Sequence, residues 1–155
     1  MENKKVLMIC VSLHHGNTAK IAEMMGSVLG AKIIKPSEVG NDDLVGYDLI
    51  GFGSGIYNRR HHQALFDLVD KLPAQNQKKA FIFSTNTFGL VKTLHEPFRR
   101  KLIEKGFDIA GEFACPGFIN HGIMKYWFGG LSKGRPNEND LQKAREFAEG
   151  LKQKI

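Results

Sequence analysis

Short apolar runs alternate with longer amphipathic segments along the whole chain. The first run, residues 5–11, is apolar after its opening lysine, as expected for a strand that is buried on both faces of a sheet. Later runs of similar length are bounded by glycine, proline or polar residues, which is typical of strands. We therefore predict five strands, over residues 5–11, 31–34, 47–53, 80–84 and 107–115.

The segments between these strands carry apolar residues at helical spacing. Gly30 ends the first predicted helix and Pro73 ends the second. The last helix begins at Asn137, an Asx cap with Asp140 three residues further on. Strands that alternate with helices predict βαβ units, and hence an α/β fold in which helices cover both faces of a parallel sheet. With no internal repeat and no linker, we expect one domain over residues 1–155.

Composition narrows the class of protein. Hydrophobic residues make up 42% and charged residues 25% of the 155 positions, as in soluble globular proteins. The start of the chain resembles no secretory signal, and no apolar run is long enough to span a bilayer. The two cysteines, Cys10 and Cys115, are too few for a disulfide scaffold, which favours a cytoplasmic protein with reduced thiols.

The net charge is +6, which indicates an anionic partner or ligand. The basic residues are scattered in short groups without interleaved aromatic residues, so the sequence does not favour nucleic-acid binding. Metal binding is not predicted either. The two histidine pairs, at 14–15 and 61–62, are adjacent in sequence, and adjacent side chains do not face each other on a regular element.

Ligands of an open parallel sheet bind beyond the carboxyl ends of its strands, so the loops after strands one, three and four are the candidates for a site. The first, Ser12 to Thr18, joins a buried strand to a helix start, where free backbone amides suit a phosphate. The alternative is a plain helix start capped by Asn17 or Thr18. A phosphatase built on Cys10 needs an arginine six residues later, but that position is Gly16.

The three loops together resemble those of the flavodoxin family, over essentially the whole chain. Residues 12–18, Ser-Leu-His-His-Gly-Asn-Thr, are similar to the phosphate loop of that family. Residues 53–58 resemble its loop at the inner flavin face, and residues 84–89 its loop at the pyrimidine edge and other face. The resemblance implies a five-stranded sheet of order 2-1-3-4-5 that binds FMN. It implies as FMN-binding residues Ser12, His14, His15, Gly16, Asn17, Thr18, Ser54, Gly55, Ile56, Tyr57, Asn58, Ser84, Thr85, Asn86, Thr87, Phe88 and Gly89.

An aromatic ring at Tyr57 suits this interpretation, because a flavin is a large flat apolar plate. Phe88, or an aromatic residue of the long segment 116–136, is a candidate for the second face. The alternative for Tyr57 is an aromatic residue that only caps the core. No residue needs to act as a general acid or nucleophile, since the cofactor carries the electron chemistry.

Two redox functions remain open. The first is an electron carrier between protein partners, which the chain length and the three loops favour. The second is a small enzyme that takes hydride from NAD(P)H and passes it to a quinone or another small-molecule acceptor. The basic charge favours this enzyme, as do the aromatic residues Tyr126, Trp127 and Phe128, which can roof a substrate or join two subunits. A flavin-binding sensor is a third class, and both a monomer and a homodimer are compatible with the sequence.

The chain departs from the family in two respects that bear on these functions. Flavodoxins that serve as electron carriers are typically acidic, whereas this chain is basic. In addition, Asn58 follows Tyr57 where many short flavodoxins have glycine.

Overall fold

A parallel sheet forms the centre of the molecule. The structure is a computed structural model that describes residues 3–12, 16–40, 42–86, 91–116 and 135–155. The sheet has the strand order β2-β1-β3-β5-β6, and all of these neighbours pair in parallel. This arrangement confirms the predicted fold class and the order 2-1-3-4-5. The strands are β1 (Val6–Val11), β2 (Lys32–Ile34), β3 (Leu49–Tyr57), β5 (Lys78–Thr85), β6 (Phe107–Cys115) and a short additional strand, β4 (Arg60–His61).

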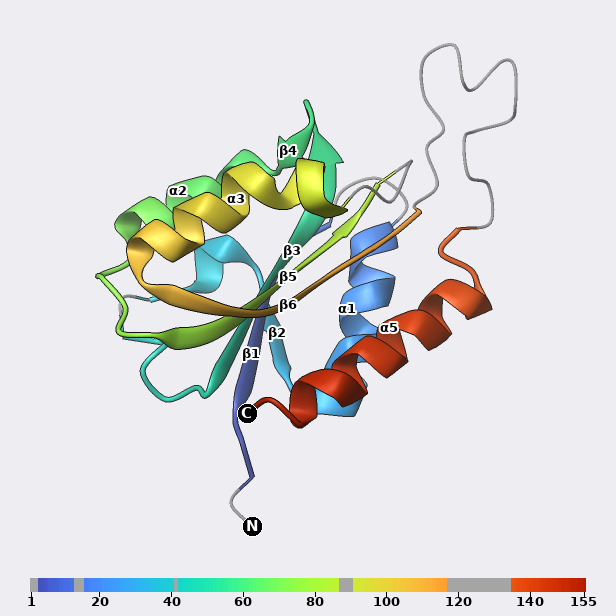
Figure 1. The fold of residues 1–155 in the computed structure, drawn as a ribbon, viewed down its shortest axis with the longest axis horizontal. Coiled ribbons are helices and arrows are strands. Elements are labelled where there is room, and N and C mark those ends of the chain that lie inside the picture. The colour runs from blue at the N-terminus through green and yellow to red at the C-terminus, as the bar shows by residue number, and fades with distance from the viewer. Residues whose placement is uncertain (1–2, 13–15, 41, 87–90, 117–134) are drawn as a thin grey trace.

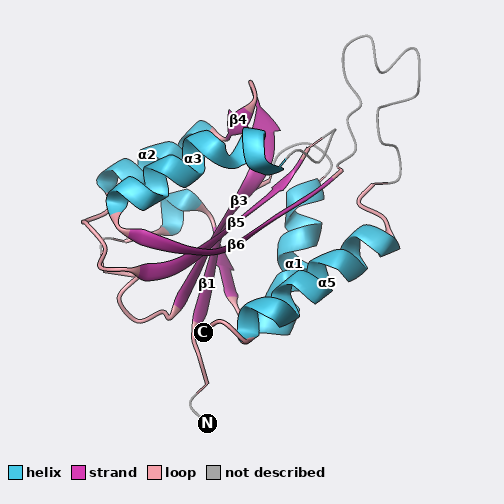
Figure 2. Cartoon of the chain, in the orientation of Figure 1, coloured by secondary structure: helices cyan, strands magenta, loops and turns pink. Residues whose placement is uncertain are grey.

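Helices cover both faces of the sheet (Figure 1). The first and last helices, α1 (Asn17–Leu29) and α5 (Glu138–Lys152), pack together on one face. The other face carries α2 (Gln63–Lys71) and α3 (Val91–Lys105), with a short 3-10 turn, η1 (Pro36–Glu38), after β2. Figure 2 shows the same layers by type of secondary structure. No helix of the described chain is long and apolar enough to cross a membrane.

Side chains of the central strands enter two separate cores. On β1, Leu7 and Ile9 join the core beneath α2 and α3, whereas Met8 and Cys10 join the core beneath α1 and α5. All four are less than a tenth exposed. The continuous apolar run in the sequence is therefore explained by burial on both faces of the sheet.

Two glycines of β3 let two phenylalanines of β5 lie flat across the sheet. Gly51 pairs with Phe81 and Gly53 with Phe83. A Cβ atom at Gly51 would lie 2.3 Å from the Phe81 ring, and one at Gly53 would lie 2.1 Å from the Phe83 ring. Both distances are far inside van der Waals contact, so only glycine fits at these positions while the rings keep their place.

Strand β3 runs further than the sequence predicts. Residues 53–58 were expected to form a loop, but the strand continues to Tyr57 and turns back into β4, with Tyr57 paired to Arg60. The two turn residues, Asn58 and Arg59, have φ angles of 51° and 65°. Two consecutive left-handed residues are the conformation of a tight two-residue hairpin turn. The expectation of a loop was wrong because arginine at such a position gives no turn signal.

The predicted start of the last helix is confirmed. The Asn137 side chain accepts a hydrogen bond from the Asp140 amide at 3.0 Å, and the Asp140 carboxylate accepts one from the Asn137 amide at 2.9 Å. Asp140 is buried and also pairs with Arg135, which lowers the pKa of its carboxyl group against the opposing effect of burial. The cap and the ion pair together fix where α5 begins.

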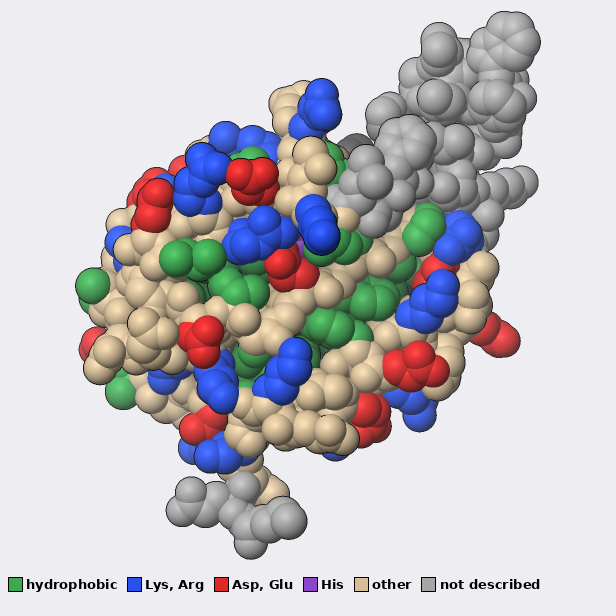
Figure 3. All heavy atoms as spheres, viewed as in Figure 1, with side chains coloured by type: hydrophobic (Ala, Val, Ile, Leu, Met, Phe, Trp, Pro, Cys, Tyr) green, Lys and Arg blue, Asp and Glu red, His purple; other side chains and the backbone are tan. Residues whose placement is uncertain are grey.

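Charged side chains of both signs cover the outer surface. Figure 3 shows lysine and arginine interspersed with aspartate and glutamate, with hydrophobic side chains visible between them along the edge strand β6. This edge is only partly covered: six consecutive residues of β6, Ile109 to Ala114, are neither fully buried nor fully exposed.

We expect Gly53→Ala to destabilise the protein by about 1–3 kcal/mol, because the new methyl group has to displace the Phe83 ring. Urea unfolding followed by circular dichroism measures the change. Gly46→Ala is the matched control, since a Cβ atom there meets nothing within 4 Å. Equal stability of the two variants would show that the flat packing of Phe83 against β3 is not required.

Candidate functional site

Three segments at the carboxyl ends of β1, β3 and β5 meet at one edge of the sheet (Figure 1). The first and third are joined directly, because the hydroxyls of Thr18 and Thr85 hydrogen bond at 2.8 Å. Both threonines are buried, at 2% and 6% exposure. Two segments that are 67 residues apart in the sequence therefore lie together at this edge.

The first segment places a helix start at this edge. Gly16 is the residue before α1, with a φ angle of 65°, and as a glycine it has no side chain that could cap the helix. The alternative interpretation, in which Asn17 or Thr18 caps the helix, is therefore wrong: both are the first residues of the helix itself. The Ser12 hydroxyl accepts a hydrogen bond from the Ala19 amide at 3.1 Å. The first turn of α1 contains no acidic residue, so the positive end of its dipole is not offset there.

The second segment is the end of β3 and its hairpin. The Ser54 hydroxyl donates to the Gly55 carbonyl oxygen at 2.6 Å and accepts from the His62 amide at 3.0 Å, which ties the two strands together. The Tyr57 ring contacts the His62 ring edge to face at 5.4 Å. Its hydroxyl lies only 2.9 Å from where a Cβ atom of Gly55 would be, so the ring folds back over this glycine.

Tyr57 is half-buried, and both burial and the neighbouring Cys10 raise the pKa of its hydroxyl. The ring therefore lies near the carboxyl end of β1 as well as β3. Ile56 pairs with His61 in the hairpin, and Asn58 forms its turn. All the residues predicted for the second segment thus belong to a defined strand and turn.

The third segment begins with Ser84, Thr85 and Asn86, all of which are buried. Asn86 follows the last residue of β5, and its backbone amide donates to the Cys115 carbonyl oxygen at 3.0 Å. Its side-chain amide donates to the Ser84 hydroxyl at 3.2 Å. The remaining predicted residues of this segment, Thr87, Phe88 and Gly89, lie outside the described residues.

Two further groups of predicted residues also lie outside the described part of the chain. They are His14 and His15 in the first segment, and the aromatic residues Tyr126, Trp127 and Phe128 in the long segment after β6.

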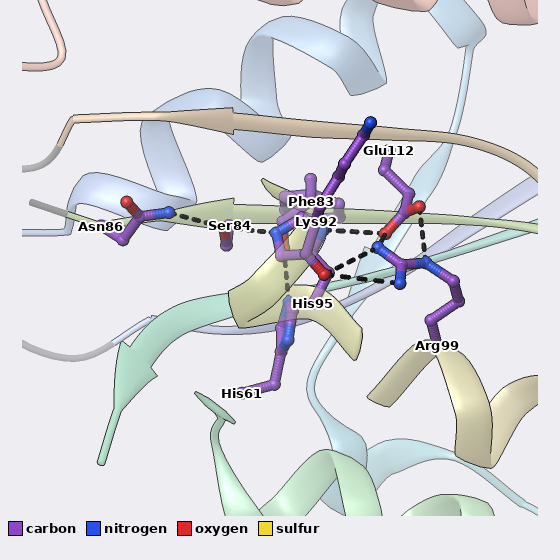
Figure 4. Close-up of polar contacts among 8 residues, drawn as sticks. All are labelled: His61, Phe83, Ser84, Asn86, Lys92, His95, Arg99 and Glu112. Carbon is purple, nitrogen blue, oxygen red and sulfur yellow. Dashed lines mark hydrogen bonds and ion pairs between the residues drawn. The ribbon is translucent and has the colours of Figure 1, made fainter. Parts of the chain in front are cut away.

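A buried polar network beneath the third segment was not predicted from the sequence (Figure 4). His95 of α3 is fully buried, with Nε2 2.7 Å from the Ser84 hydroxyl and Nδ1 3.1 Å from Glu112 Oε1. Arg99 holds the same carboxylate with two hydrogen bonds, each 2.8 Å long. The His61 ring lies against His95, with centroids 4.8 Å apart.

The pKa shifts of Glu112 and His61 in this network have different causes. Burial raises the pKa of the Glu112 carboxyl group, but its hydrogen bonds with His95 and Arg99 lower it more, so the net shift is downward. Burial and the neighbouring His95 lower the pKa of His61 to about 3, and His61 is therefore neutral at physiological pH. Its Nε2 bonds to the Phe83 carbonyl oxygen at 3.2 Å, which identifies this nitrogen as the protonated one.

Ser84, His95 and Glu112 have the connectivity of a hydrolase triad, but their surroundings do not suit one. A nucleophilic serine has to reach its substrate, whereas Ser84 is fully buried and its hydroxyl accepts the Asn86 amide. Cys10 is not a nucleophile either, because burial raises the pKa of its thiol to about 12.

The histidines do not gather a metal-ligand set in the described chain. His61 and His62 point to different partners: His61 contacts His95 and the Phe83 carbonyl oxygen, and His62 Nδ1 accepts the Ala64 amide at 3.0 Å at the start of α2. No group of three or more potential metal-ligating side chains occurs among the described residues. The polar groups brought together at the sheet edge are hydroxyls and amides instead.

Comparison with known proteins agrees with this architecture. Residues 8–108 match the family described as a flavodoxin domain. An uncharacterized protein from Methanocaldococcus jannaschii is 49% identical over 148 residues, covering 95% of this chain and 97% of that protein.

Solved flavodoxin structures share the fold at low sequence identity. The oxidised flavodoxin 2 of Bacillus cereus has a TM-score of 0.71 at 19% identity, covering 97% of this chain and 99% of its own. The flavodoxin of Fusobacterium nucleatum bound to flavin mononucleotide has a TM-score of 0.68 at 12% identity, covering 98% and 99%. The matching family region spans most of the sheet and all three candidate segments, and the chain belongs to the flavodoxin family.

Proposed function

We propose that this protein binds FMN at the carboxyl edge of its sheet and transfers electrons through it to a partner protein. The hydrogen bond between Thr18 and Thr85 carries the proposal, because it joins the segment suited to a phosphate to the segment suited to a flavin edge. The fold is that of flavodoxins, one of which is bound to flavin mononucleotide.

The donors at the edge fit a phosphate. The start of α1 offers backbone amides and the positive end of a helix dipole, which favour an anion. Ser12 and Thr18 add hydroxyls, and Gly16 leaves the approach free of a side chain. No carboxylate occurs in the described residues of this segment, 12 and 16–20, so nothing there repels an anion.

The end of β3 fits a flat aromatic ligand. Tyr57 is half-buried at the same edge, and Gly55 beneath its ring keeps that surface flat. A flavin stacked on Tyr57 gains about 0.5–1.5 kcal/mol beyond the burial of apolar surface. Bound FMN would supply the electron chemistry, while the chain binds the cofactor, orients it and sets its electrostatic surroundings.

The charge around this edge favours an anionic partner. No aspartate or glutamate occurs in the described segments at the ends of β1, β3 and β5 or at the start of α3. These segments are residues 12, 16–20, 54–63, 84–86 and 91–95. They carry four cationic residues, Lys20, Arg59, Arg60 and Lys92. Figure 3 shows cationic side chains at the tip of the hairpin, which projects from the molecule.

Arg59 is the most informative of these cations. It is exposed and has a φ angle of 65°, a conformation that costs a residue with a side chain about 1–2 kcal/mol. Arg60 beside it is held by the Phe66 ring, 4.2 Å from its guanidinium carbon. Arg59 is thus an exposed cation in a strained backbone conformation, two residues from Tyr57. This position supports a role in docking an acidic protein.

We expect Thr18→Val to weaken FMN binding by about 1–3 kcal/mol, because it removes a hydroxyl that can bond a charged oxygen. Quenching of flavin fluorescence measures the dissociation constant. Riboflavin, which has no phosphate, should lose less affinity than FMN. Ser27→Ala removes an exposed hydroxyl in the last turns of the same helix and serves as the control. Equal losses for FMN and riboflavin would contradict the phosphate assignment, and no FMN binding by the unmodified protein would overturn the proposed function.

A carrier and an NAD(P)H-dependent enzyme differ in their reductant. With FMN bound, we expect dithionite to remove the yellow absorbance and NADPH alone to leave it unchanged, since a carrier receives its electrons from a protein. The basic edge is the observation that favours the enzyme, because it also suits the phosphates of NADPH. Rapid bleaching by NADPH without another protein would establish the enzyme instead of the carrier.

The docking role of Arg59 can be tested with small oxidants of opposite charge. We expect Arg59→Glu to slow oxidation of the reduced FMN protein by ferricyanide roughly tenfold at low salt, and not to slow oxidation by the cationic hexaamminecobalt(III). Stopped-flow absorbance measures both rates. Lys152→Glu, at the far end of α5, is the control with the same change in net charge. Equal effects of the two variants would mean that net charge, and not the hairpin, attracts the anion.

A further inference from the structure

The Tyr57 ring is held by packing and not by a hydrogen bond. Its hydroxyl bonds to no residue that the structure describes, and the half-buried ring lies over Gly55. Among the described residues, one aromatic side chain contacts this ring, the imidazole of His62. The two ring centroids are 5.4 Å apart and the planes are at 89°. The conformation of the side chain that we propose to stack on the flavin therefore depends on its packing against His62.

His62 is itself held in one orientation. It is the cap residue before α2, and its Nδ1 accepts a hydrogen bond from the Ala64 amide at 3.0 Å. Its backbone amide donates to the Ser54 hydroxyl at 3.0 Å, and its carbonyl oxygen accepts from the Leu65 amide at 3.0 Å. Because the backbone and one ring nitrogen are both engaged, the imidazole presents a fixed surface to Tyr57.

Helix α2 gives this cap a rigid base, since four of its nine residues are buried in the core. The hairpin of β3 and β4 leads directly into this helix (Figure 1). A cap alone would be supplied better by asparagine, aspartate or serine, which are the preferred residues at this position. A histidine at residue 62 adds a ring that reaches Tyr57, and so links the position of a packed helix to a side chain at the end of β3.

The backbone of the hairpin has anchors that do not involve the His62 ring. Tyr57 pairs with Arg60 across the two strands. The guanidinium carbon of Arg60 lies 4.2 Å from the centre of the Phe66 ring, and the same group donates to the Gln63 side chain. These contacts keep the path of the chain. Loss of the imidazole would therefore release the Tyr57 side chain and leave the hairpin in place.

We infer that His62 is a positioning residue whose imidazole fixes the Tyr57 side chain in the conformation that stacks on the flavin. The inference rests on the proposed binding of FMN at this edge. A side chain that is already held in its bound conformation loses no rotamer freedom when the ligand binds, so the affinity is higher. His62 acts through Tyr57, and this role requires no contact between His62 and the cofactor.

Two substitutions separate the cap from the ring. His62→Asn keeps an acceptor for the Ala64 amide but removes the ring, because asparagine is a favoured cap. His62→Phe keeps a ring beside Tyr57 and removes the acceptor. We expect His62→Phe to lower the midpoint of thermal unfolding by about 2–4 °C and to leave the Tyr57 ring in place. His62→Asn should have the opposite pattern of effects.

The first test needs no flavin. In the isotope-labelled apoprotein, three-bond NMR couplings to the Cγ atom of Tyr57 report whether its χ1 angle occupies one staggered rotamer or several. We expect one rotamer in the unmodified protein and in His62→Phe, and averaged couplings in His62→Asn. Tyr47, which precedes β3, is the internal control, and its couplings should be the same in all three proteins. A single unchanged Tyr57 rotamer in His62→Asn would overturn the inference.

The second test measures the bound flavin. His62→Asn should raise the dissociation constant of FMN about two- to tenfold, as expected when one more side chain has to be ordered on binding. Quenching of the flavin fluorescence should weaken. The reduction potential should shift in the same direction as in Tyr57→Leu, but less far. His62→Phe should keep the affinity and the potential of the unmodified protein, although it is less stable.

A double-mutant cycle tests whether His62 acts through Tyr57. In a Tyr57→Leu background, His62→Asn should change the dissociation constant of FMN by less than about twofold, because the ring that it positions is absent. A loss of the same size in both backgrounds would contradict the positioning role, since His62 would then contribute to binding independently of Tyr57.

The outcomes separate this inference from the proposed function. Equal FMN affinity and potential in His62→Asn and the unmodified protein, with Tyr57 averaged in the apoprotein, would overturn the effect on the flavin. No FMN binding by the unmodified protein would overturn the proposed function and this effect with it, while the couplings would still decide the link between His62 and Tyr57. If His62→Asn does not fold, His62→Ser, which also keeps a cap acceptor, takes its place.

Discussion

The flat packing of Phe81 and Phe83 against Gly51 and Gly53 is the contact on which the geometry of the site depends. It sets the register of β3 against β5, because each ring can lie only where its partner strand has no side chain. A shift by one residue would place a ring over Phe52, which belongs to the other core. With this register the chain brings Ser54 beside Ser84 at the carboxyl edge.

The second constraint is that polar groups buried near this edge need hydrogen-bond partners. Ser84, His95 and His61 are each at most 1% exposed, and burial of such groups without partners costs several kcal/mol in total. Ser84 and His95 bond to each other, His95 bonds to Glu112, and His61 bonds to a backbone carbonyl through Nε2, while its buried Nδ1 has no hydrogen-bond partner among the described residues. Arg99 pairs with Glu112, the carboxylate that bonds to His95. The result is a polar layer between the hydrophobic core and the proposed flavin edge.

The protein combines the fold of flavodoxins with a different surface at the proposed docking edge. Carriers of this family are typically acidic, whereas the described segments around the ends of β1, β3 and β5 are basic. The strained Arg59 at the hairpin tip is the clearest local difference. Because electrostatic complementarity governs encounter rates more than affinity, such a surface changes which partners meet the site rather than how the site is built.

The sequence by itself determined the alternation of strands and helices, a parallel sheet and the three segments at its carboxyl edge, whereas the strand order was implied by the resemblance to flavodoxins. The strands and helices rest on local patterns: apolar runs such as residues 5–11, helical spacing, and caps such as Asn137 with Asp140. The hairpin after Tyr57 escaped prediction because Arg59 adopts a left-handed conformation that its side chain disfavours. The backbone preferences of single residues could not indicate that the tertiary structure holds Arg59 in this conformation.

Only the tertiary structure decided which polar residues act together. Thr18 meets Thr85 across 67 positions, and His95 meets Ser84 and Glu112 across 11 and 17. In the sequence, His95 resembles any other polar residue of a helix, because no local pattern indicates that it is buried or which residues it contacts. The contacts of His95 arise because α3 packs on β5 and β6, which pair in a defined register. The register of β5 against β3 depends in turn on the packing of two phenylalanine rings between strands that are distant in the chain.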